Sequence, residues 1–177
     1  DATTVNAATG NTIQTTSGEL DIQTNVGTLN ITGADATLLT IDGNGDAAVL
    51  LAAVTDTANP NLTVNSEGAV NIVSVAMGTG TLTVNVDNDA DGTATGTFGA
   101  LTAGTIDISG SANAGPPVTL NDTLTFNGLV NSTVAATTID TAATVNVNAG
   151  ITAATTLDIN DATTVNAATG NTIQTTS

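Results

Sequence analysis

The chain has 177 residues with 16 carboxylates and no Lys, Arg or His, which gives a formal net charge of −16. Without a cationic side chain it cannot neutralise phosphates or attach to an anionic lipid surface, so nucleic acid binding and electrostatic membrane binding are excluded. The longest apolar run, residues 47–54, is too short to cross a bilayer, and we expect no membrane insertion. The absence of Cys excludes disulfides and thiolate metal sites.

Short alternating segments recur from one end of the sequence to the other. In each of them a polar residue stands between two apolar residues, and this pattern predicts a short strand with one buried face. They are residues 20–22, 29–31, 39–41, 62–64, 70–72, 82–84, 106–108, 124–126, 145–147 and 157–159. With 40% apolar residues, a mean hydropathy of +0.24 and only three prolines, the chain is too hydrophobic for disorder. We therefore expect an all-β fold.

The part of the chain near residues 43–120 is less regular than its ends. Residues 46–58 read as a short helix that is N-capped by its first residue. Residues 109–117 include two successive prolines and predict a loop. Beyond this part, Asn127 and Gly128 stand between apolar residues, which is the usual signal for a two-residue hairpin turn.

The first 17 residues return without a change as the last 17, so residues 1–17 and 161–177 are identical. Identity over that length indicates a tandem array. We expect residues 1–160 to be one full repeat unit of β coils and residues 161–177 to be the start of the next identical unit. We also expect the chain to be a segment of a much longer polypeptide.

A shorter period is superimposed on this repeat. Residues 139–157 match residues 159–177 at 9 of 19 positions, and a second echo has an offset of 18. One coil per period predicts a β-solenoid (β-helix) with roughly 18–20 residues per coil, so that about eight coils fill the unit. Asn and Thr are then expected to form ladders along the axis. Tandem β-sandwich (Ig-like) adhesin domains are the alternative, because their strands have a similar spacing.

One acidic loop has the spacing of a calcium site. Asp87, Asp89 and Asp91 occupy its positions 1, 3 and 5, and Gly92 follows where the loop must turn around a cation. Over these six residues the loop resembles the calcium loops of EF-hand and dockerin-type sequences. It departs from them at position 12, where Phe98 replaces the bidentate Glu. A solvated acidic turn is the alternative interpretation.

A second motif has similar spacing with one carboxylate fewer. It consists of Asp42, Asn44 and Asp46, with a glycine in each gap. It is similar to the Gly/Asp repeats of RTX proteins, which hold Ca²⁺ between the turns of a parallel β-roll. A plain glycine-rich turn is the alternative. Ca²⁺ is thus the cofactor that these two motifs predict.

The sequence contains few side chains that could catalyse a reaction. Without His, Lys, Arg, Cys or Tyr, only carboxylates, hydroxyls and amides remain. A glycosidase with two carboxylates is the enzyme that such groups allow, but the aromatic platforms and cationic clamps of sugar sites are missing. We expect no enzyme activity.

The Thr/Ala/Asn/Gly-rich composition and its repeats resemble the giant repeat proteins of bacterial and archaeal surfaces. Filamentous-haemagglutinin-like β-helical adhesins, RTX adhesin stalks and Thr/Ala-rich S-layer proteins are the most similar classes. The resemblance extends over the whole chain and lies in its composition and repeat pattern. It implies secretion, a place outside the cell at its surface, and rigidity that depends on calcium.

Two functions are therefore expected. The first is a structural repeat of an extracellular filament, stalk or surface layer, whose partners are copies of itself stacked end to end through β-strands. The second is an adhesin module, either a calcium-rigidified extender or a domain that binds surface glycans. For the latter, the loops at residues 87–97 and 109–117 are the expected binding surface.

Overall fold

The computed structural model describes residues 2–7, 10–23, 27–91, 93–110, 122–140, 142–166 and 171–176. These residues form nineteen β-strands and no helix. The strands are β1 (Ala2–Asn6), β2 (Asn11–Thr15), β3 (Leu20–Ile22), β4 (Thr28–Thr32), β5 (Leu38–Gly43), β6 (Val49–Thr57), β7 (Asn61–Ser66), β8 (Val70–Ala76), β9 (Thr81–Val86), β10 (Thr95–Ala103), β11 (Thr105–Gly110), β12 (Thr123–Phe126), β13 (Val130–Ser132), β14 (Thr137–Asp140), β15 (Thr144–Val147), β16 (Ile151–Ala153), β17 (Leu157–Ile159), β18 (Thr163–Val165) and β19 (Ile173–Thr175). All ten alternating segments of the sequence lie in strands, as predicted.

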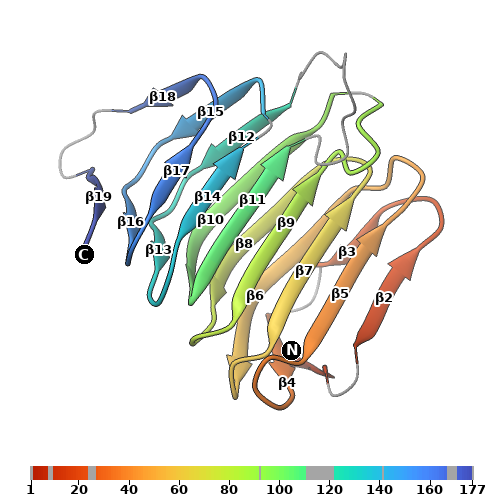
Figure 1. The fold of residues 1–177 in the computed structure, drawn as a ribbon. Helices are drawn as coiled ribbons and strands as arrows, with labels where there is room; N and C mark the ends of the chain where they lie inside the picture. The colour runs from red at the N-terminus through yellow and green to blue at the C-terminus, as the bar shows by residue number, and fades with distance from the viewer. Residues whose placement is uncertain are drawn as a thin grey trace.

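The strands wind into a β-solenoid, with the N-terminal and C-terminal strands at opposite ends of the stack (Figure 1). Every strand pair in the described residues is parallel, for example β4 with β6 and β5 with β7. Because sandwich sheets are antiparallel, this pairing decides between the two predicted architectures in favour of the solenoid.

Two sheets form the walls of the solenoid. The larger sheet runs β1-β4-β6-β8-β10-β12-β15-β18, with β3, β13, β16 and β19 beside this path, and the smaller runs β17-β14-β11-β9-β7-β5-β2. Six complete coils follow one another in the described residues: β3–β5, β6–β7, β8–β9, β10–β11, β12–β14 and β15–β17.

Each coil contains three strand positions. The first position holds β3, the first halves of β6, β8 and β10, and then β12, β15 and β18. The second position holds β1, β4, the second halves of β6, β8 and β10, and then β13, β16 and β19. The third position is the smaller sheet. In the central coils one long strand covers the first two positions, whereas towards the C-terminal end two short strands share them.

Glycine marks the bend between the first two positions. A Cβ on Gly99 would lie 1.9 Å from the carbonyl oxygen of Val73, and one on Gly128 would lie 2.3 Å from the backbone nitrogen of Ala100. The backbones of successive coils thus approach too closely here for any side chain.

The core consists of apolar columns parallel to the axis. Phe98 and Phe126 stack in the first position with ring centroids 5.1 Å apart and an interplanar angle of 24°. Both rings are fully buried. The predicted polar ladders also form on the outside, where Asn85 Nδ2 donates to Asn65 Oδ1 over 2.8 Å. Like residues therefore lie above like residues, as expected for stacked coils.

The coils are longer and less uniform than the predicted 18–20 residues. The offset is 20 residues between Leu62 and Leu82, but it is 31 residues between Ile106 and its partner Thr137. Pairing with the neighbouring coils limits how long a strand can be. The additional residues of a longer coil therefore lie in its corners, as in residues 87–94. The described residues consequently form six complete coils where the average period predicted eight.

Two local predictions are wrong. Residues 46–58, predicted as a helix, contain strand β6, because its backbone pairs with β4 and β8 on both sides. Asn127 and Gly128 do not reverse the chain. They join β12 to β13, which lie in the same sheet and both pair in parallel with β10. Parallel partners supply pairing that the local sequence does not encode.

Candidate functional site

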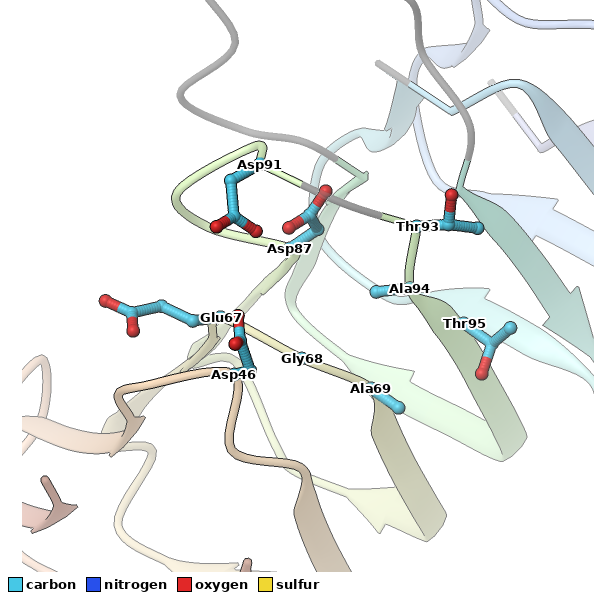
Figure 2. A pocket seen from close by; sticks show the side chains of 9 residues that line it. All are labelled: Asp46, Glu67, Gly68, Ala69, Asp87, Asp91, Thr93, Ala94 and Thr95. Atoms are coloured by element: carbon cyan, nitrogen blue, oxygen red, sulfur yellow. The ribbon is translucent and has the colours of Figure 1, made fainter. Parts of the chain in front are cut away.

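An acidic corner lies where the chain passes from the third position of one coil to the first position of the next. We define it by Asp46, Glu67, Asp87, Asp89 and Asp91, which come from three successive turns of the solenoid. Part of this corner encloses a hollow of about 420 Å³. Figure 2 shows the side chains of four of these acidic residues around that hollow.

The loop after β9 is shaped by its backbone. Asp87 and Ala90 have positive φ angles of 52° and 58°. The carbonyl oxygen of Asp87 accepts a hydrogen bond from Ala90 N over 2.9 Å, which closes a tight turn. Asn88 N donates to Ser66 O over 2.8 Å and ties this turn to the previous coil. Asp87 as a whole residue is only 1% exposed, and it lines the hollow.

Three carboxylates from two loops converge at this corner. One oxygen each of Asp46, Asp89 and Asp91 lies within 4.8 Å of the other two, and all three residues are exposed. The negative charge of Asp89, followed by that of Asp46, raises the pKa of Asp91 above its usual range. No cationic side chain in the sequence relieves this repulsion. The arrangement offers hard oxygen ligands of the kind that Ca²⁺ takes.

The two predicted motifs contribute unequally to this group. Asp89 and Asp91 of the first motif meet Asp46 of the second, and Asp87 lines the hollow together with Asp46 and Asp91. Asp42 and Asn44 are outside the three-carboxylate group. Gly92 lies outside the described residues.

Asp42 and Asn44 are instead engaged with each other. The amide of Asn44 donates to Asp42 Oδ2 over 3.2 Å and to Thr15 O over 3.0 Å. The pair thereby holds the corner to the preceding coil.

Sequence reasoning missed Glu67. Its carboxylate accepts a hydrogen bond from the backbone N–H of Gly45 and lines the hollow. The number of residues between successive coils is the signal that could have identified it. Val49 pairs with Val70, 21 residues later, and the same offset relates Asp46 to Glu67. A carboxylate at this spacing lies one coil above the first.

Other carboxylates hold backbone groups at corners. Asp122 is fully buried, and its Oδ1 accepts from Ala94 N over 2.7 Å. Asp161 Oδ2 accepts from Ala142 N over 3.0 Å, while partial burial raises its pKa. Asp56 accepts from Gly78 N over 3.2 Å at a different corner. Much of the negative charge therefore has a structural use that needs no ion.

The two ends of the solenoid are a second candidate site. In the part of the chain that the structure describes, β1, β2 and β3 each pair on one side only, as do β17, β18 and β19. Such edges present unpaired backbone groups to another chain. The last strands also leave apolar side chains exposed: Val165 is 45% exposed and Ile173 is 39% exposed.

Comparison with protein-family models, with curated proteins and with solved structures gives no match. Among the described residues there is also no helix long and apolar enough to pass through a membrane.

Proposed function

We propose that the chain is a structural repeat of an extracellular filament, stalk or surface layer, in which units stack end to end through parallel β-strands. One observation supports this above all. Residues 161–177 repeat residues 1–17, and their strands β18 and β19 extend the parallel ladder of the last complete coil. The start of a unit is therefore a surface that fits the end of a unit.

The contacts of these strands supply the cohesion. Val145 N donates to Ala162 O over 2.9 Å, and Ile151 N donates to Thr172 O over 2.8 Å. Each such bond contributes about 0.5–1.5 kcal/mol net, so a full coil of them gives a stable junction. The core also continues across the junction, because Val147 faces Val165 and Ile151 faces Ile173.

The proposed partners are other copies of the unit, and the proposed location is the cell surface. A chain without thiols, Lys or Arg offers no site for thiol oxidation or for tryptic cleavage, which suits a long-lived exposed fibre. We propose no catalytic role, since carboxylates, hydroxyls and amides are the polar side chains that the chain supplies.

The test is electron cryo-microscopy of chains that contain one, two and four consecutive units. The proposal expects a continuous rod with axial layers about 4.8 Å apart through every unit boundary and a length that grows in proportion to the number of units. Beads joined by flexible links would contradict it.

We also propose that the acidic corner binds Ca²⁺ and stiffens the rod. Asp46, Asp89 and Asp91 would hold the ion, with Glu67 and Asp87 adjacent. The convergence of three carboxylates from two loops supports this part of the proposal. A glycan fits the hollow less well, because its lining has no aromatic side chain.

Calcium binding is measured by titration calorimetry on the full chain. Asp89→Asn combined with Asp91→Asn should lower the affinity at least tenfold, because two of the three converging charges are lost. Asp35→Asn combined with Asp21→Asn removes the same charge from exposed positions elsewhere and is the matched control. Equal affinities in the two double variants would overturn the assignment of this corner.

A further inference from the structure

The same 17-residue sequence occupies two different places in the solenoid. At the N-terminal end, β1 lies in the second position and β2 lies in the third. At the C-terminal end, the identical residues form β18 in the first position and β19 in the second. Ile13 accordingly faces Ile41 in the smaller sheet, whereas its equivalent Ile173 faces Ile151 in the larger sheet.

The segment retains its own corner in both places. Asn11 Nδ2 donates to Asn6 O at the N-terminal end, and Asn171 Nδ2 donates to Asn166 O over 2.8 Å at the C-terminal end. These two bonds join equivalent atoms of the repeat. The pair of strands thus keeps an internal hydrogen bond while it moves around the coil by one position.

The shapes of the end coils permit this shift. The last complete coil consists of three short strands, β15, β16 and β17, of four, three and three residues. The N-terminal edge consists of β1, β2 and β3, of five, five and three residues. Three short strands per coil give three similar edges. The central coils, where strands of seven or nine residues cover two positions at once, lack this equivalence.

We propose that successive units of the array are rotated about the solenoid axis by one strand position. The proposal rests on the end-to-end stacking proposed above and specifies its geometry. β15, β16 and β17 of one unit receive β1, β2 and β3 of the next. These three strands belong to the second, third and first positions of their own unit, so every third unit returns to the same orientation.

The rotated junction matches side chains across the boundary. Val147 meets Val165, the second unit's equivalent of Val5, in the first position. In the third position, β17 with the sequence Leu-Asp-Ile meets β3 with the same sequence. Both apolar residues of that triplet then face the interior over identical residues. Rotation of successive units also distributes their acidic corners around the rod. Without rotation, the acidic corners of all units would lie along one edge.

The first test locates residues 161–177 in the 177-residue chain by disulfide formation. Thr164 is the register partner of Asn146, while Thr152 is the partner of Gln174. Parallel register partners lie within the Cα separation of 4.4–6.8 Å that a disulfide requires. We expect Thr164→Cys to cross-link with Asn146→Cys and not with Thr152→Cys. The opposite result would put the segment in the second position and overturn the rotation.

The second test uses a chain of two consecutive units, with residues numbered within each unit. Asp158→Cys in the first unit should cross-link with Asp21→Cys in the second, because rotation puts β3 on β17. Without rotation β2 lies on β17, and Asp158→Cys should instead cross-link with Thr12→Cys. Circular dichroism of the reduced variants verifies that each one keeps its β structure.

The outcomes separate the two proposals. Cross-linking to Asp21→Cys supports the rotation. Cross-linking to Thr12→Cys overturns the rotation and leaves end-to-end stacking intact. If neither pair forms in well-folded variants, the rotation is overturned, and units that also remain separate beads in electron cryo-microscopy overturn end-to-end stacking as well.

Discussion

The central coils and the end coils of this solenoid both consist of parallel strands, but they differ in strand length and in how far they bury apolar side chains. In the centre, long strands enclose fully buried side chains such as Leu51 and Phe98. At the C-terminal end, short strands leave Val165 and Ile173 more than one-third exposed. The difference teaches that apolar burial is concentrated in the middle of the stack, while the terminal coils leave apolar side chains that the proposed end-to-end stacking would cover.

The largest expected effect is at the stacked pair of buried rings, where the long strand β10 meets β12. Phe126→Ala should destabilise the chain by about 3–5 kcal/mol, because it removes a fully buried ring and the stacking of that ring on Phe98. Denaturant unfolding measures the change. Val134→Ala, at a side chain that is 52% exposed, is the matched control and should change the free energy of unfolding by less than about 0.5 kcal/mol. Similar losses in both variants would remove the contrast between core and surface.

The next effect is at the bend between the first two positions. Gly128→Ala should cost about 1–3 kcal/mol, because its Cβ would overlap backbone atoms of Gly99 and Ala100. Gly18→Ala is the comparison: its φ of +81° is strained for Ala, but nothing lies within 4 Å of the added carbon. Thermal unfolding of both variants separates close packing of coils from simple backbone strain. A larger loss for Gly18→Ala would show that coil contact at the bend is unimportant.

A smaller effect concerns the external ladder. Asn85→Ala should cost about 0.5–1.5 kcal/mol, because the side-chain bond between Asn85 and Asn65 is lost. A double-mutant cycle with Asn65→Ala isolates the pair. An interaction energy of zero would mean that the ladder sets register without adding stability.

The smallest effect is on pH dependence. Burial, followed by the charge of Asp140, raises the pKa of Asp107 in the folded chain. The folded chain therefore binds protons more readily than the unfolded chain, and this group favours folding at low pH. That contribution is lost as pH rises from the usual value of 3.8 through the raised pKa.

Asp107→Asn should consequently flatten the fall of the melting temperature that accompanies a rise in pH above 3.8. Calorimetry over that range provides the measurement. Asp35→Asn removes a carboxylate from an exposed turn and is the control. A slope that is the same in Asp107→Asn and in the unsubstituted chain would exclude a role for this group.

The sequence predicted the strands well because alternation is a local property. Each apolar–polar–apolar triplet lies in a strand, including Leu20–Ile22 and Leu157–Ile159 at the two ends. The sequence failed at residues 46–58 and at Asn127-Gly128, where local propensity favoured a helix and a hairpin. In both places the neighbouring coils offered parallel backbone partners, and this pairing outweighed the local preference.

The candidate metal site was predicted in part. Asp89 and Asp91 follow a known spacing, so one loop was recognisable. Their proximity to Asp46 depends on how many residues separate successive corners, and that number changes from coil to coil. Glu67 has no motif of its own and joins the site only because it lies between the other two corners.

The sequence by itself determined the class of fold, the absence of any cationic side chain and the identity of residues 1–17 with residues 161–177, because these follow from composition, alternation and repetition. The tertiary structure decided the lengths of the coils, which acidic residues meet, and in which strand position each copy of the 17-residue segment lies. These depend on pairing between residues about 18–31 positions apart. Main-chain hydrogen bonds accept almost any side chain at that distance, so only the packed neighbours fix the register.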